Sequence, residues 1–211
     1  MTTLHTSANT QYAGTPLEEA ERAMIFLHGR GSSADDTLQL ADHLRLTKTA
    51  CVGLQATNHT WYPYSFLAPE AQNQPWLDSA IELVHHTLDD LNEQGFANAD
   101  IYLLGFSQGA CLALESVARR PTKYGGVFAL SGGLIGLGVN QRTYEGDFGQ
   151  TPVFMGCDAA DPHIPKERFL DTADVLKTLN ANVEAVLYDN LGHTINQDEI
   201  EWVNAILING V

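Results

Sequence analysis

Residues 105–109 read Gly-Phe-Ser-Gln-Gly and carry the clearest chemical signal in the chain. They follow an apolar run of strand length at residues 101–104 and precede a helix-like stretch at residues 110–120, which stops at Pro121. A strand that reverses sharply into a helix strains its central residue, and only small flanking residues allow so close an approach. This turn would raise the Ser107 hydroxyl above the sheet, beside the positive end of the helix. The pattern therefore predicts a nucleophilic serine.

His193 is the histidine best placed to activate that hydroxyl, which is a poor nucleophile until a base takes its proton. It lies in a loop between a predicted strand at residues 183–188 and a predicted helix at residues 195–207. The other histidines are weaker candidates, since they lie on predicted helices, in other loops or in the polar first segment, and His28 belongs to a tight turn.

A carboxylate is needed to fix the tautomer of this base and to stabilise its cation. The loop after the predicted strand at residues 152–156 offers Asp158 and Asp161. We favour Asp161, because nearby prolines stiffen its backbone, whereas Asp158 is nearer the strand end and could bind the turn. The resulting order of serine, aspartate and histidine is the order expected of α/β-hydrolases.

Backbone N–H groups must also point to where negative charge develops on the reacting carbonyl oxygen. One donor is expected from Gln108, directly after the serine, and another from the glycine-rich turn at residues 28–31. Glycines allow this turn to be tight enough to present its N–H groups. His28 is expected to be structural.

Strand and helix patterns alternate along the chain, which favours a mostly parallel sheet with helices on both faces. The predicted strands are residues 23–28, 51–54, 101–104, 126–130, 152–156 and 183–188, and the predicted helices are 32–46, 76–91, 110–120, 166–179 and 195–207. The candidate residues follow strands, so they should meet at one edge of the sheet. We expect one domain over residues 1–211, whose polar segment 1–22 could add a short edge strand around Tyr12.

The composition disfavours several classes of partner. Eleven basic and 26 acidic residues give a net charge of −15, which should repel nucleic acid and anionic membranes. We see no secretory signal in residues 1–22 and no apolar stretch of about 18 residues that could span a membrane. The three cysteines lack metal-site spacing, so we expect no metal site and a reducing compartment, the cytoplasm.

Five motifs together resemble those of the phospholipase/carboxylesterase family, which includes bacterial carboxylesterases and acyl-protein thioesterases. They lie at residues 27–31, 61–63, 105–109, 161–165 and 192–194. The resemblance implies an α/β-hydrolase fold without a large cap domain, and hydrolysis of esters or thioesters with no cofactor. By matching positions, it assigns the nucleophile to Ser107, the base to His193 and the acid to Asp161, with an oxyanion hole formed by the backbone N–H groups of Arg30 and Gln108.

Arg30 departs from the family pattern, in which many members carry an apolar residue at this position. Its side chain could meet a substrate carboxylate and favour small polar or acidic esters, or it could point to solvent or pair with an acid. Trp61 and Tyr62, in the aromatic loop of residues 58–75, are expected to bind substrate, although such residues also pack loops onto sheets.

Two other functions remain open: a lactonase similar to dienelactone hydrolase, and a hydrolase fold used only for binding. A serine rather than a cysteine at residue 107 counts against the first, and the complete set of three catalytic residue types counts against the second. Three apolar residues in or near the last predicted helix, Trp202, Ile206 and Ile208, could belong to the core or form a homodimer contact.

Overall fold

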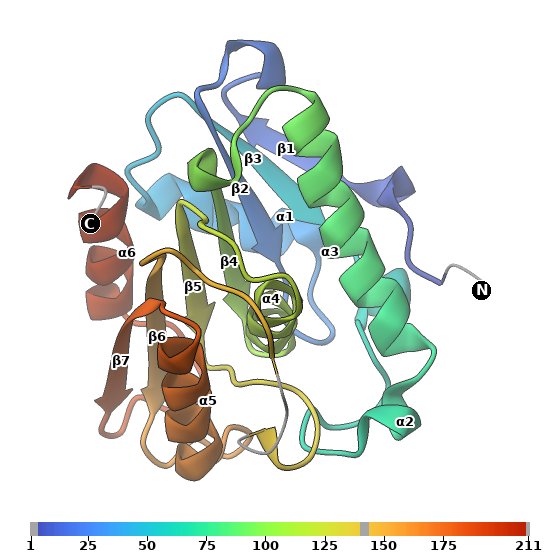
Figure 1. Cartoon of the computed structure of the whole chain (residues 1–211), viewed down its shortest axis with the longest axis vertical. Helices are drawn as coiled ribbons and strands as arrows, with labels where there is room; N and C mark the ends of the chain where they lie inside the picture. Colours follow the sequence, from blue (N-terminus) through green and yellow to red (C-terminus); the bar gives the residue numbers. More distant parts are fainter. Residues whose placement is uncertain (1–3, 140–143, 210–211) are drawn as a thin grey trace.

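A seven-stranded sheet forms the centre of the protein, whose computed structural model describes residues 4–139 and 144–209 (Figure 1). The strand order is β1-β3-β2-β4-β5-β6-β7; β1 pairs antiparallel with β3 and every other pairing is parallel. The strands are β1 (Gln11–Gly14), β2 (Arg22–Leu27), β3 (Thr49–Leu54), β4 (Ile101–Phe106), β5 (Gly126–Leu130), β6 (Pro152–Asp158) and β7 (Asn182–Tyr188). The predicted mostly parallel sheet is confirmed, and β1 contains Tyr12.

Helices cover both faces of the sheet, as the alternating pattern predicted (Figure 1). On one face lie α3 (Trp76–Glu93), α4 (Gln108–Arg119) and α5 (Lys166–Thr178). On the other lie α1 (Ala34–Leu38) and α6 (Gln197–Asn209). The short α2 (Glu70–Asn73) precedes α3.

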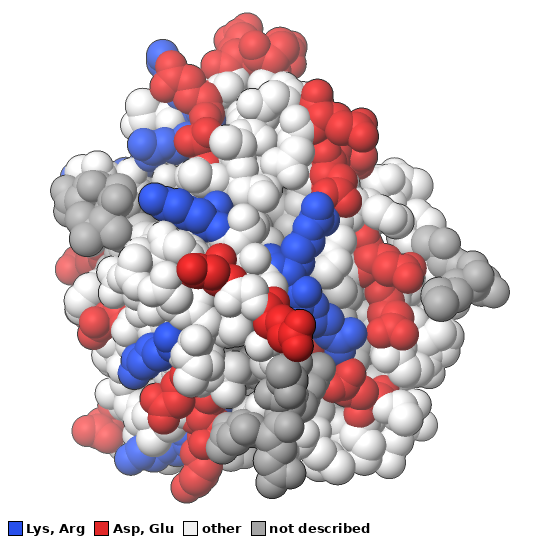
Figure 2. Space-filling model, in the orientation of Figure 1, with Lys and Arg blue, Asp and Glu red and all other residues white. Residues whose placement is uncertain are grey.

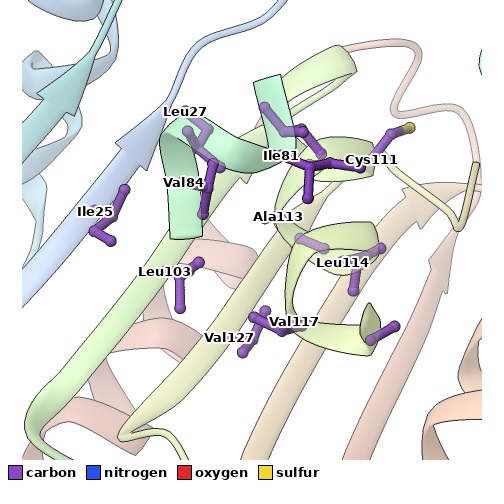
Figure 3. Close-up of a cluster of buried hydrophobic side chains, with 14 of the residues drawn as sticks. Ile25, Leu27, Ile81, Val84, Leu103, Cys111, Ala113, Leu114, Val117 and Val127 are labelled. Atoms are coloured by element: carbon purple, nitrogen blue, oxygen red, sulfur yellow. The ribbon is translucent and has the colours of Figure 1, made fainter. Parts of the chain in front are cut away.

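Two apolar layers hold the helices to the sheet. In β2, Ala23, Ile25 and Leu27 face the first layer, while Met24 and Phe26 face the second. Figure 3 shows the first layer, where side chains from β2, β4 and β5 meet those of α3 and α4. Because alternate residues of a strand point to opposite faces, a strand apolar throughout is buried on both sides.

The helix predicted at residues 32–46 is only partly formed. The five-residue α1 is followed by a 3-10 turn at Gln39–His43. A reciprocal capping box between Ser33 and Asp36 starts α1. The helix packs so closely on β3 that a Cβ at Gly53 would come within 2.8 Å of Leu38. Aspartate, threonine and histidine favour helices weakly, so this stretch follows the packing rather than its periodicity.

The three apolar residues at the last helix, α6, differ in how far they are buried. Trp202 is 36% exposed and stacks on Phe154, with ring centroids 5.8 Å apart, and Ile206 packs against the same core layer. Ile208 is 55% exposed. Trp202 and Ile206 therefore contribute to the core.

The segment between β5 and β6 contains no α-helix or strand in its described residues, 131–139 and 144–151. No helix in the described part of the chain is long and apolar enough to cross a membrane. Figure 2 shows acidic side chains gathered over the C-terminal end of α3 and over the turn between β1 and β2.

Glu199, in the first turn of α6, is a fully buried carboxyl group. Its Oε2 accepts a hydrogen bond from the N–H of Asn196 (2.9 Å), and its Oε1 lies where a Cβ at Gly156 would be only 2.2 Å away. Burial raises the pKa of Glu199 from 4.5 to about 7. Between about pH 4.5 and about pH 7, the folded protein therefore keeps a proton on Glu199 that the unfolded chain has already lost.

We expect the contribution of Glu199 to the free energy of unfolding to fall as the pH rises from about 4.5 to about 7, because at this carboxyl group the folded state binds more protons in that window. The variant Glu199→Gln imitates the protonated carboxyl group. Above pH 7 its free energy of unfolding should exceed that of the wild type by up to about 3 kcal/mol, and the gap should close towards pH 5. Urea unfolding across this range measures the gap. The exposed Glu201→Gln is the control, and a gap independent of pH would contradict the assignment.

Candidate active site

Ser107 sits at the turn between β4 and α4 in a left-handed backbone conformation, with φ +54°. Its N–H donates to the carbonyl of Leu130 on β5 (2.9 Å). A Cβ at Gly105 would lie 2.3 Å from the carbonyl oxygen of Gly109, and one at Gly109 would lie 2.0 Å from that of Leu27. Real side chains do not approach backbone atoms so closely, so this strand-to-helix turn requires both glycines.

Three predicted residues from separate loops meet at this turn. The Nε2 atom of His193 lies 2.8 Å from the Oγ of Ser107, and its Nδ1 lies 2.7 Å from the Oδ2 of Asp161. Because a carboxylate only accepts hydrogen bonds, Nδ1 carries the proton and Nε2 can accept from the serine hydroxyl. The His193 side chain is 19% exposed and that of Asp161 is fully buried. The arrangement can move a proton away from Oγ.

Asp161 is held ionised and in place by donors on both oxygens. Its Oδ1 accepts from the N–H groups of His163 (2.7 Å) and Ile164 (3.0 Å). Burial tends to raise the pKa of Asp161, but the hydrogen bonds from His193 and from these two N–H groups outweigh it and lower the pKa. The side chain therefore faces His193 as a carboxylate.

Asp158 has a different task. Its oxygens accept from the N–H groups of Gly192 and Ala160, both at 2.6 Å. These bonds, above all the one from Gly192, lower the pKa of Asp158. Asp158 thus ties the loop that carries His193 to the end of β6.

Two backbone N–H groups near Ser107 are available to a ligand. Within the described residues, no acceptor takes the N–H of Arg30 or that of Gln108, the first residue of α4. The Gln108 side chain is occupied: its Oε1 accepts from the N–H of Trp61 (3.0 Å), and its Nε2 donates to the carbonyl of Tyr62 (2.8 Å). Gln108 therefore anchors the aromatic loop and leaves its own N–H free to stabilise an oxyanion.

Trp61 and His28 are buried and do not line the pocket over Ser107. Trp61 is fully buried, and its Nε1 donates to the carbonyl of His28 (2.8 Å). His28 is also buried, and its Nε2 accepts from the N–H of Ala56 (3.0 Å). Of the two aromatic residues expected to bind substrate, only Tyr62 is part of the pocket wall.

A pocket of about 710 Å³ opens over Ser107. Its lining residues are Gly29, Arg30, Ser32, Tyr62, Pro63, Tyr64, Ser65, Phe66, Phe106, Ser107, Gln108, Cys111, His163, Ile164 and His193. Burial raises the pKa of Cys111 to about 12, so its thiol stays protonated and is a poor rival nucleophile. The size suits a small molecule.

Two residues on this wall were not predicted to take part. The ring of His163 meets that of His193 edge to face, with centroids 4.7 Å apart, and the ring of Phe106 lies 5.1 Å from His193 on centroids. The sequence signal was only their adjacency to Asp161 and Ser107. Both rings therefore contact the imidazole of His193.

A family model described as Phospholipase/Carboxylesterase matches residues 14–208. The chain belongs to this family. Among curated relatives, acyl-protein thioesterase 1 of Saccharomyces cerevisiae is 27% identical and the match covers 88% of this chain and 91% of that protein. A probable carboxylesterase of Oryza sativa subsp. japonica is 30% identical, with 84% and 73% covered.

Among solved structures, a phospholipase/carboxylesterase from Dyadobacter fermentans superposes with a TM-score of 0.91 at 45% identity, covering 96% of this chain and 97% of that one. The fold is thus that of the α/β-hydrolases in the phospholipase/carboxylesterase family. The comparisons place the chain among hydrolases of the carboxylesterase and thioesterase type, as the five motifs predicted.

Proposed function

We propose that this protein is a serine hydrolase that cleaves carboxylic esters or thioesters of small to medium acyl groups through an acyl-enzyme. The observation that carries the proposal is the continuous hydrogen-bonded chain from the Oγ of Ser107 through His193 to Asp161, on the wall of a pocket of about 710 Å³. A protein that only binds its ligand does not need a series of hydrogen bonds that joins a serine, a histidine and an aspartate. Family membership gives independent support for ester and thioester substrates.

In the acylation step, the Oγ of Ser107 bonds to the carbonyl carbon while its proton passes to the Nε2 of His193. The carbonyl oxygen becomes an oxyanion and accepts from the N–H groups of Arg30 and Gln108. When the tetrahedral intermediate collapses, the bond to the alcohol or thiol breaks, and the leaving group takes the proton from His193. Asp161 stabilises the imidazolium meanwhile.

The deacylation step repeats this chemistry with water as the nucleophile. His193 accepts a proton from water as its oxygen bonds to the acyl carbon, and the same N–H groups bind the second oxyanion. The bond to Oγ then breaks, Oγ recovers its proton from His193, and the carboxylic acid leaves. The cycle needs no redox partner and regenerates the free serine.

A fluorophosphonate probe tests the nucleophile directly, because it phosphonylates only an activated serine. We expect one probe per folded chain, located at Ser107 by peptide mass spectrometry, and no labelling of Ser107→Ala. Folded wild-type protein that takes up no probe would overturn the proposal in favour of a binding protein. Rates on matched aryl esters, thioesters and lactones then separate an esterase from a lactonase, which should prefer the lactones.

We also propose that the protein works in a reducing compartment, the cytoplasm. Cys51, Cys111 and Cys157 are buried free thiols, and burial raises the pKa of each, to about 11, 12 and 12 respectively. Free thiols of this kind are the normal state of cysteine in reducing compartments.

A further inference from the structure

The pocket over Ser107 differs in charge from the rest of the molecule. The chain has 26 acidic residues against 11 basic ones, yet the described residues that line the pocket include no aspartate or glutamate and do include the exposed Arg30. On the face drawn in Figure 2, acidic groups lie among basic and uncharged ones. A local cation in an acidic protein attracts an anion where the surface elsewhere repels one.

The guanidinium of Arg30 is held in a fixed position by neutral oxygens. Its Nη1 donates to the Oγ1 of Thr60 (2.8 Å) and the carbonyl of Pro63 (3.1 Å), and its Nη2 donates to the carbonyl of Tyr64 (2.8 Å). It also lies 6.0 Å from the centroid of the Tyr62 ring. These contacts hold the Arg30 side chain in one position against the aromatic loop.

Its charge is nevertheless left without a counter-ion. Within the described residues, no carboxylate forms an ion pair with Arg30. An arginine has five N–H groups, of which three are used here, so the Nε–H and one N–H on Nη2 have no partner among those residues. Arginine and carboxylate form strong charge-assisted hydrogen bonds.

Arg30 belongs both to the proposed oxyanion hole and to the wall of the pocket. Its backbone N–H is a donor of the proposed oxyanion hole, and its side chain lies on the wall of the same pocket. A substrate whose carbonyl oxygen occupies the oxyanion hole is therefore close to a positioned cation. Binding energy from such a remote group can orient the reacting carbonyl.

We propose that Arg30 binds a carboxylate on the acyl part of the substrate, so that the enzyme prefers monoesters or monothioesters of short dicarboxylic acids. This inference rests on the proposed function. It assigns Arg30 as a residue that determines specificity for charge as well as one that holds the aromatic loop.

The test compares kcat/KM for the 4-nitrophenyl monoester of succinic acid with that for its neutral methyl ester. The wild type should prefer the anionic substrate, and Arg30→Gln should lower this preference ratio by about 10- to 100-fold. The ratio is the readout because a disturbed loop or oxyanion hole slows both esters alike. Arg30→Lys, which keeps the charge but loses the fork, should retain part of the preference.

Arg168 provides a matched control, because it lies over the ring of Phe66 (5.7 Å to the centroid) but does not line the pocket. Arg168→Gln should leave the preference ratio unchanged. Raising the salt concentration should lower the ratio in the wild type and have little effect in Arg30→Gln.

Two results would overturn the inference. If the preference for the anionic over the neutral ester were the same in wild type, Arg30→Gln and Arg30→Lys, the Arg30 side chain would only hold its loop in place. The same comparison can be made with the carboxylate on the alcohol part, using 3-carboxyphenyl acetate and phenyl acetate. If Arg30 affected the preference only in this second pair, the assignment of the carboxylate to the acyl part would be wrong. In both cases fluorophosphonate labelling of the wild type would persist, whereas failure of the proposed function would abolish it.

Discussion

Ser107→Ala should lower kcat on a 4-nitrophenyl ester by about 10⁶-fold, because members of a triad act as a unit and the acyl-enzyme cannot form without Oγ. The backbone N–H groups would remain and leave a small residual rate. The φ of +54° is equally strained for serine and alanine, so the melting temperature should change little. Steady-state rates with freshly purified variant, beside circular dichroism, measure both quantities.

Ser131 offers a matched control for this experiment. It is buried, follows β5 as Ser107 follows β4, and has a similar φ of +56°. It is not hydrogen-bonded to His193, so Ser131→Ala should keep kcat within a few-fold of the wild type. If Ser107→Ala kept more than about 1% of wild-type kcat, another group would have to be the nucleophile.

Asp161→Asn should lower kcat by about 10⁴-fold near neutral pH. The side chain keeps its size, but its amide can donate to Nδ1 and favour the tautomer in which Nε2 carries the proton. That histidine could not accept from Ser107, and no carboxylate would stabilise the imidazolium. Single-turnover rates on an aryl ester measure the loss of the acylation step.

Asp158→Asn is the informative comparison, since Asp158 ends β6 and Asp161 lies three residues further along the chain. The carbonyl oxygen of the new amide can still accept from the N–H groups of Gly192 or Ala160. We expect a loss of kcat below about 10-fold, because the loop would loosen while the catalytic hydrogen bonds remain. A larger loss in Asp158→Asn than in Asp161→Asn would exchange the roles of the two residues.

Local patterns were sufficient for most of the fold. Strands apolar throughout predicted a buried parallel sheet because both of its faces are covered, and the two glycines around Ser107 predicted the turn because no side chain fits there. The stretch at residues 32–46 was the weakest prediction. Its backbone conformation depends on packing against β3, and the periodicity of one segment carries no information about such a contact.

The types and the order of the candidate catalytic residues follow from short motifs at strand ends, which can be recognised in the sequence. The three-dimensional arrangement determines that Asp161 faces His193, because Asp158, at the end of β6, accepts from the N–H groups of Gly192 and Ala160 instead. It also leaves Trp61 out of the pocket wall and puts Tyr62 on it, and it gives the Arg30 guanidinium neutral partners from a loop about 30 residues away. Contacts between distant loops depend on strand order and backbone direction, and neither is written in any one segment.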